Sequence, residues 1–218
     1  MLFVKTPILI MKLFPELIWR LTSKEESQDN HVFLTFDDGP TPEVTPWVLD
    51  CLKEYKAKGT FFCLGRNVEK HQKIYNQILD QGHAVGNHTY SHLKGWNTPD
   101  SEYFDDVQLA SHNIESGLFR PPYGRFRKNQ IRKLSKDYKI VMWDLLSQDY
   151  DHGITPQKCL ANVDSNIRPG SIIVFHDSVK AKKNLYYALP QLLEKHSGDY
   201  EFRPIVKTPQ FSQQRVAV

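Results

Sequence analysis

Two adjacent acids, Asp37 and Asp38, follow directly after the apolar run 32–36. The run is rich in β-branched and aromatic residues, which predicts a buried strand. Gly39 and Pro40 then end the strand and turn the chain. Side chains alternate faces along a strand, so both acids can serve one site only if the backbone turns there. A carboxylate pair at the carboxyl end of a strand is typical of α/β catalytic sites, although it could also cap a following helix.

A second candidate group consists of His88 and His92, which are four residues apart. If these residues form one helical turn, both imidazoles share a face and can reach one ion. Asp38 would complete a set of three ligands, and three protein ligands with a fourth position open to water are typical of a catalytic zinc site. The spacing also occurs by chance. Because the pair follows a predicted strand at 83–86, as the acids follow theirs, we favour a shared metal site.

The elements that must position these residues alternate regularly along the chain. Strands are predicted at 32–36, 60–64, 83–86, 118–119, 139–143, 171–175 and 201–205, with helical patterns between them. Repeated strand–helix units predict a parallel sheet. Unusual polar residues follow five of the strands, and a barrel gathers all its strand ends in one ring. We therefore predict an α/β fold, a single-domain distorted (β/α)7 barrel.

Composition narrows the function classes. A chain of 218 residues fits one large α/β domain. The net charge of +3 is too small to indicate a nucleic-acid partner. Three cysteines without metal-ligand spacing predict buried, reduced thiols. The sequence does not determine the oligomeric state.

The first 30 residues contain a short apolar patch that Lys12 interrupts. It is too short and too charged for a signal peptide or a transmembrane segment. We predict that 1–30 is an apolar helical extension packed on the domain and broken near Pro15, that 31–206 is the main domain, and that 207–218 is a polar tail. An interfacial membrane helix is the alternative. The default location is then cytoplasmic, with peripheral membrane association as the alternative.

Five segments in order resemble the motifs of the polysaccharide deacetylase family, the NodB-homology domain of carbohydrate esterase family 4. They are Thr35-Phe-Asp-Asp-Gly39, His88-Thr-Tyr-Ser-His92, Arg120-Pro-Pro-Tyr-Gly124, the stretch from Trp143 to Tyr150, and Val174-Phe-His-Asp177. The resemblance covers about residues 30–205. It implies a distorted (β/α) barrel of about seven strands, which agrees with the pattern above.

The resemblance also implies roles for individual residues. Asp38, His88 and His92 would bind a divalent metal, usually zinc, with cobalt or nickel as alternatives. Asp37 would be the general base that takes a proton from water activated by the metal. Arg120 would hold Asp37 in place and keep it ionised; otherwise it is a plain salt-bridge residue.

On the leaving-group side, the resemblance implies that His176 is the general acid that protonates the departing amine. Asp149 would pair with His176 and favour its imidazolium form. Alternatively, His176 is an ordinary histidine at a strand end and Asp149 caps the next loop.

For the substrate, the resemblance implies that the backbone N–H of Tyr123 helps to stabilise the oxyanion. Tyr150 and Val174 would line a pocket for the acetyl methyl group. They stand where the family usually has tryptophan and leucine, and Leu146 stands where an aspartate is usual. Trp96 and Tyr123 are candidates for stacking on sugar, although Trp96 could equally pack in the core.

Together these features predict a metal-dependent hydrolase that removes N-linked acetyl groups from amino sugars of a glycan, so the expected partner is an acetylated glycan or amino sugar. An O-acetyl esterase or a small-molecule amide deacylase of the same fold remains an alternative. A catalytically silent glycan-binding module is a third, which the intact set of acids and histidines disfavours.

Overall fold

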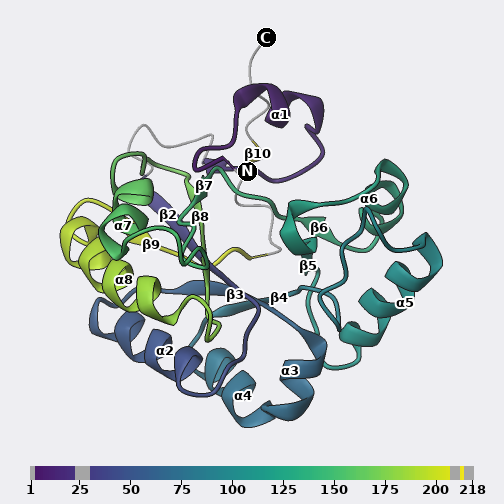
Figure 1. Cartoon of the computed structure of the whole chain (residues 1–218), viewed down its shortest axis with the longest axis horizontal. Helices are drawn as coiled ribbons and strands as arrows, with labels where there is room; N and C mark the ends of the chain where they lie inside the picture. The colour runs from purple at the N-terminus through teal and green to yellow at the C-terminus, as the bar shows by residue number, and fades with distance from the viewer. Residues whose placement is uncertain (1–2, 23–29, 207–211, 214–218) are drawn as a thin grey trace.

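The computed structural model describes residues 3–22, 30–206 and 212–213. Its centre is a curled parallel sheet in the order β6-β5-β4-β3-β2-β8-β7, with β9 pairing with β2 outside this path (Figure 1). The strands are β2 (His31–Asp37), β3 (Gly59–Cys63), β4 (Ala84–Asn87), β5 (Leu118–Phe119), β6 (Lys139–Ile140), β7 (Leu145–Leu146), β8 (Ile172–His176) and β9 (Glu201–Phe202). The predicted single-domain distorted (β/α)7 barrel is therefore confirmed.

Two strand predictions need correction. The apolar run 139–143 was predicted as one strand, but β6 ends at Ile140 and β7 follows as a separate strand. Asp144 lies between the two strands, with its carboxylate buried and hydrogen-bonded to the Ile172 N–H at 2.9 Å. The predicted seventh strand, 201–205, contributes only β9, which pairs with the beginning of β2. The seventh strand of the barrel is instead β7.

The helices lie on the outside of the curled sheet and cover its outer face (Figure 1). They are α2 (Val44–Glu54), α3 (Gly65–Lys70), α4 (Gln72–Asp80), α5 (Asp100–Ser111), α6 (Lys128–Leu134), α7 (Pro156–Asp164) and α8 (Lys182–His196). The α7 helix is capped at its N-terminus, because the Thr155 hydroxyl accepts the Lys158 N–H at 3.1 Å. The helical segment between β3 and β4 is divided at His71 into α3 and α4.

The central strand β2 separates two hydrophobic clusters and is buried at every position. Val32, Leu34 and Phe36 pack on the side of the helices, whereas Phe33 packs inside the barrel. This alternation is the period of two expected of a strand. It places Thr35 and Asp37 on the inner face, so β2 delivers an acid to the interior of the barrel at its carboxyl end. All three cysteines are buried and free.

The N-terminal segment lies along the open seam between the edge strands β6 and β7. Ile18 donates its N–H to the Ile140 carbonyl at 2.9 Å, and Leu146 donates to the Val4 carbonyl at 2.8 Å. Only α1 (Ile8–Leu13) is helical, and the chain from Pro15 makes a turn and two isolated bridges, at Ile18 and Arg20, before β1 (Leu21–Thr22). The helix predicted for this region is therefore much shorter than expected, because its backbone bonds to the barrel instead.

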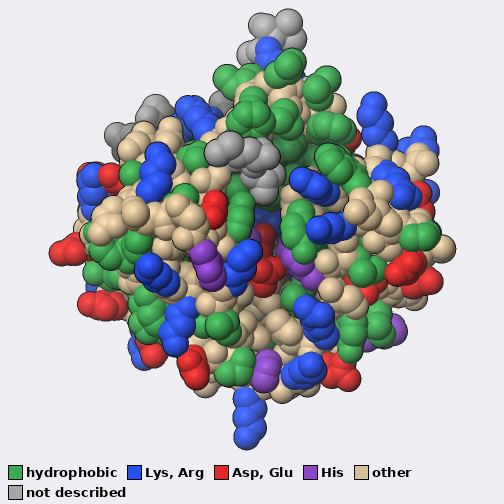
Figure 2. Space-filling model, viewed as in Figure 1, with side chains coloured by type: hydrophobic (Ala, Val, Ile, Leu, Met, Phe, Trp, Pro, Cys, Tyr) green, Lys and Arg blue, Asp and Glu red, His purple; other side chains and the backbone are tan. Residues whose placement is uncertain are grey.

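Only part of the apolar N-terminal segment packs on the domain. Leu17, Ile18 and Trp19 are buried, whereas Leu9 and Leu13 are 69% and 64% exposed. Figure 2 shows the resulting hydrophobic surface over α1, at the top of the molecule. Residues 23–29 and most of the predicted tail 207–218 lie outside the described residues, but β10 (Ser212–Gln213) pairs with β1. No helix in the described part of the chain has the length and apolarity needed to span a membrane.

Candidate active site

The carboxyl ends of four strands bring the candidate residues together. β2 ends at Asp37, β8 ends at His176, and the register pairs these two residues directly. The neighbouring strands β4 and β5 are followed by His88 and Arg120. Parallel strands place their carboxyl ends at one edge of a barrel, and Figure 2 shows acidic and histidine side chains together near the centre of the face in view.

Asp38, His88 and His92 form a cluster that fits a metal ion. Their potential ligand atoms all lie within 4.8 Å of one another. Asp38 Oδ1 lies 3.1 Å from His92 Nε2 and 3.7 Å from His88 Nε2. The Oδ1 atom of Asp38 is buried and accepts no hydrogen bond from the described residues. A carboxylate oxygen and two imidazole nitrogens are a donor set that zinc and similar divalent ions bind, and a cation at the cluster would give this buried oxygen a partner.

The surroundings of the cluster favour a neutral His88 imidazole and an ionised Asp38 carboxylate, the protonation states in which these groups bind metal. His88 Nδ1–H donates to the Arg120 carbonyl at 2.8 Å, so Nε2 faces Asp38 as the free lone pair. Burial lowers the pKa of His88 to about 4, against the opposing effect of the nearby carboxylates, so its imidazole is neutral. Burial acts to raise the pKa of Asp38, but the imidazoles of His92, His176 and His88 outweigh it and hold that pKa well below its ordinary value.

The two histidines converge from a loop, and the prediction that they share one helical turn was wrong. Thr89 and His92 have φ angles of 67° and 66°, in the left-handed region that a right-handed helix excludes. Asn87 Oδ1 accepts the Thr89 N–H at 2.8 Å, and Asp106 Oδ2 accepts two more N–H groups of the loop. These buried acceptors replace helical hydrogen bonds and fix the loop.

Asp37 is held by a fully buried arginine. Arg120 Nη1 donates to Asp37 Oδ1 at 2.7 Å and to the Thr35 hydroxyl at 2.7 Å. Its remaining nitrogens donate to the carbonyls of Val141 and Met142, both at 3.0 Å. The guanidinium is therefore fixed at every nitrogen by the barrel interior. Asp37 Oδ2 makes no hydrogen bond to Arg120 and lies 4.0 Å from His88 Nε2, on the side of the Asp38–His88–His92 cluster.

His176 and Asp149 form a second pair across the site. Asp149 is fully buried and accepts both the His176 ring Nδ1–H at 2.8 Å and the His176 backbone N–H at 2.7 Å. Burial acts to lower the pKa of His176, but the charge and hydrogen bond of Asp149, with the charges of Asp38 and Asp37, outweigh it and raise that pKa to about 9. The ring Nε2 carries the exchangeable proton, because Nδ1–H is committed to Asp149.

The residues predicted to contact substrate lie in different surroundings. Tyr123 has a φ of 60° and its hydroxyl lies 3.1 Å from His92 Nδ1. The Tyr150 ring meets the His176 ring edge-on, with centroids 5.0 Å apart. Val174 is 1% exposed in the inner core, beside the equally buried Leu146. Trp96 is 55% exposed, so the alternative that it packs in the core is wrong.

Sequence reasoning missed the residues that hold the Asp37–Asp38 turn. Asp177 is fully buried and its carboxylate accepts the Gly39 N–H at 3.0 Å and the Thr45 hydroxyl at 2.5 Å. A Cβ at Gly39 would lie 1.9 Å from Asp177 Oδ2, so this position requires glycine. Asn67 Nδ2 donates to the Asp38 carbonyl at 2.7 Å. The one feature of the sequence that could have indicated a role for Asp177 is its position directly after His176.

Comparisons with known proteins match most of the chain. A family model described as "Polysaccharide deacetylase" matches residues 24–143. Two peptidoglycan-N-acetylglucosamine deacetylases of Bacillus cereus are 38% identical over 155 residues and 32% identical over 183 residues, covering 67% and 80% of this chain. The chain spans 56% of the first relative and 84% of the second. The crystal structure of the Bc1960 peptidoglycan N-acetylglucosamine deacetylase is 29% identical, with a TM-score of 0.74 over 96% of this chain and 100% of that one.

Proposed function

The chain belongs to the polysaccharide deacetylase family, and from this premise we propose that it is a metal-dependent hydrolase that removes N-linked acetyl groups from amino sugars of a glycan. The observation that carries the proposal is one arrangement of side chains. The Asp38–His88–His92 cluster lies beside an acid that is held by a buried arginine and a histidine that is held by a buried carboxylate. Amide hydrolysis requires these three parts, namely an activated water, a base and an acid.

We assign the metal to Asp38, His88 and His92, with zinc as the proposed ion and cobalt or nickel as alternatives for the same donor set. A bound ion would lower the pKa of a coordinated water and polarise the acetyl carbonyl. Three protein ligands leave room for water and substrate, which distinguishes this arrangement from a structural site with four ligands. The backbone N–H of Tyr123 is the proposed further donor to the developing oxyanion.

Asp37 is the proposed general base, and its two oxygens have separate tasks. Oδ1 accepts from Arg120, which fixes the carboxylate and favours its ionised form. Oδ2 faces the metal cluster and is free to take the proton of the attacking water. Arg120 does not contact the cluster with its guanidinium, so its effect on the reaction passes through Asp37.

His176 is the proposed general acid. Expulsion of an amine requires a proton on nitrogen, because an amide anion is a very poor leaving group. Asp149 keeps the imidazole protonated and fixes the ring so that Nε2–H is the donor. The edge of Tyr150 against the ring restricts its rotation, and we propose Tyr150 as a wall of the acetyl pocket. Val174 would shape that wall from the core behind it.

The proposal is tested by measuring acetate release from N-acetylglucosamine oligosaccharides, with and without a chelator and after zinc is restored. We expect activity that the chelator abolishes and zinc recovers. Release from acetylated xylan but not from the amino-sugar oligomers would favour an O-acetyl esterase instead. Binding of either glycan without acetate release, in protein shown to contain its metal, would favour the silent binding module.

A further inference from the structure

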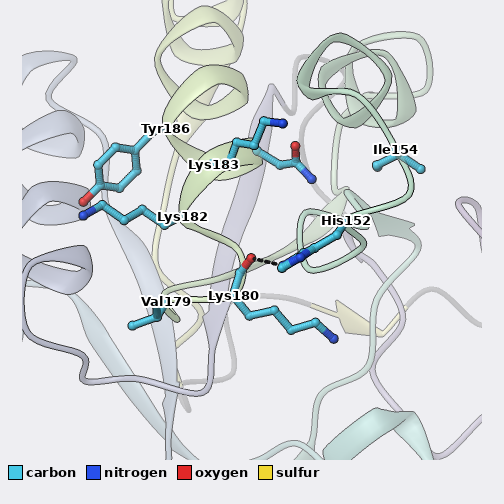
Figure 3. A pocket seen from close by; sticks show the side chains of 8 residues that line it. His152, Ile154, Val179, Lys180, Lys182, Lys183 and Tyr186 are labelled. Carbon is cyan, nitrogen blue, oxygen red and sulfur yellow. Dashed lines mark hydrogen bonds between the residues drawn. The ribbon is translucent and has the colours of Figure 1, made fainter.

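The loop that carries Asp149 is tied to its surroundings by bonds between side chains and backbone carbonyls. His152 Nε2–H donates to the Lys180 carbonyl at 3.0 Å, which connects this loop to the segment before α8 (Figure 3). Asn184, which is 3% exposed, donates through Nδ2 to the carbonyls of Asp149 and Asp151. Polar side chains that bind backbone groups thus position the acid, and the base side contains a comparable arrangement.

The backbone stretch 141–144 holds Arg120 on the base side. It connects β6 to β7 and belongs to neither strand. The carbonyls of Val141 and Met142 accept the Arg120 Nε–H and Nη2–H, both at 3.0 Å. Arg120 in turn donates to Asp37 Oδ1 at 2.7 Å. The position of the proposed base therefore depends on where these two carbonyls lie.

The next two carbonyls of the same stretch bind one residue of the N-terminal segment. Thr6, which is 8% exposed, donates its hydroxyl to the Trp143 carbonyl at 2.8 Å and its backbone N–H to the Asp144 carbonyl at 2.9 Å. Four consecutive carbonyls are therefore divided between Arg120 and Thr6, two for each.

A shift of this stretch would reach the base. Arg120 is fully buried, so a guanidinium nitrogen that lost its carbonyl would be left unpaired away from water, which is costly. The residue whose carbonyl binds Thr6 also lies close to this guanidinium, because Arg120 Cζ is 5.8 Å from the centre of the Trp143 ring. The Met142 N–H is fixed separately by the Ile18 carbonyl at 2.7 Å. The Thr6 hydroxyl fixes the stretch between that bond and β7.

We propose that Thr6 is a positioning residue for the proposed base, because its hydroxyl keeps the 141–144 stretch where the first two carbonyls can fix Arg120. The effect reaches Asp37 through Arg120. This inference rests on the proposed deacetylase function, in which Asp37 takes a proton from the attacking water. The N-terminal segment then helps to position the base as well as covering the open seam of the barrel.

The test replaces Thr6 by valine, which removes the hydroxyl and keeps the backbone N–H and the shape of the side chain. Rates are measured on an N-acetyl amino-sugar oligosaccharide and on an aryl acetate. We expect kcat to fall about 10-fold on both substrates, with KM and bound metal little changed, since a small displacement of a catalytic group slows the reaction strongly. Thr6→Ser, which restores the hydroxyl, should recover most of the loss.

Thr98→Val is the matched control. Thr98 is 7% exposed, and its hydroxyl donates to the Lys94 carbonyl at 2.9 Å in the loop before α5. The control variant therefore loses the same kind of buried bond, and it should keep the kcat of the wild type on the aryl acetate. Equal losses of kcat in Thr6→Val and Thr98→Val would overturn the inference.

A double-mutant cycle separates this role from a general effect on folding. In the Arg120→Ala background, Thr6→Val should cause no further loss of kcat on the aryl acetate, because its effect requires the guanidinium. Losses that simply add would show that Thr6 does not act through Arg120.

A measurement without turnover distinguishes this inference from the proposed function. NMR follows hydrogen exchange of the Arg120 Nε–H, and the loss of its signal in Arg120→Lys assigns it. We expect exchange to become about 10-fold faster in Thr6→Val and to stay unchanged in Thr98→Val, because only the first variant loosens the carbonyl that this group binds. That result would support the positioning role even if no acetate were released, and the deacetylase proposal alone would then fail. Equal exchange in Thr6→Val and the wild type would overturn the inference even in an active enzyme.

Discussion

Replacement of His176 should have an effect that depends on the leaving group. An amine must be protonated as it leaves, whereas an activated aryl oxide leaves without a proton. General-acid catalysis increases the rate of a reaction that needs a proton on the leaving group by about 10²- to 10⁴-fold. We therefore expect His176→Ala to lose roughly this factor in kcat/KM on an N-acetyl amino sugar and much less on an aryl acetate. Asp37→Asn should reduce both rates, because both substrates need an activated water.

The structure also predicts how the pH profile depends on the partner of His176. The carboxylate of Asp149 raises the pKa of His176 to about 9 against burial, so the acid stays protonated at neutral pH. The rate on the amide should then fall as the pH rises through this pKa, at a point above the ordinary value of 6.5. The charge of a bound metal would lower this point, since it offsets part of the contribution of Asp38 and Asp37. Asp149→Asn removes the charge but can keep a hydrogen bond, so the alkaline limb should move to lower pH.

The assay measures acetate release from the amide and aryl oxide release from the ester on the same preparations over the same pH range, with bound metal measured for each variant. Equal losses on amide and ester in His176→Ala would show that His176 is not the proton donor. An alkaline limb that does not move in Asp149→Asn would refute the argument that this pair sets the protonation state. Unchanged metal content in both variants excludes an indirect effect through the cluster.

Three further predictions follow from contacts in the site. Asp38→Asn should lower the bound divalent metal measured by elemental analysis, whereas Asp37→Asn should retain it and lose activity; equal metal content in both would contradict the ligand assignment. Arg120→Ala should reduce kcat with bound metal and chelator sensitivity unchanged, because its guanidinium acts on the base; a large rise in chelator sensitivity would contradict this. Gly39→Ala should destabilise the protein in urea unfolding by about 1–3 kcal/mol and reduce activity, because the new Cβ overlaps the Asp177 carboxylate; unchanged values of both would show that the turn can adapt.

The parallel strands and the ring of polar residues at their ends could be predicted because both depend on local patterns. An apolar run such as 32–36 predicts a buried strand wherever it occurs, and a helix between two strands makes them parallel. The ends of such strands must then meet at one edge, which is why Asp37, His88 and His176 could be placed near one another before any distance was known.

Features that depend on distant contacts could not be predicted in the same way. The break between β6 and β7 is marked by Asp144, whose carboxylate lies 3.4 Å from Arg20 and 3.6 Å from Arg168. Neither arginine is near Asp144 in the sequence, and the run 139–143 by itself resembles one continuous strand. The loop that carries His88 and His92 is left-handed at Thr89 and His92, and between them Asp106 of α5 accepts the N–H groups of Tyr90 and Ser91. A spacing of four fits this loop and a helix equally well.

Two histidines in one site are adjusted in opposite directions, and this contrast explains how the same residue type can serve two tasks. Burial lowers the pKa of His88 to about 4, and the Nδ1–H bond to the Arg120 carbonyl, which acts the other way, does not offset it, so His88 can offer a lone pair at Nε2. His176 donates Nδ1–H to a buried carboxylate, so its pKa rises to about 9 and it offers a proton. Surroundings that separate the pKa values of two groups in this way indicate different roles, here the proposed metal ligand and the proposed proton donor. The two imidazoles differ in the acceptor at Nδ1. For His88 the acceptor is the carbonyl of Arg120, which follows β5, and for His176 it is the carboxylate of Asp149, in the loop after β7.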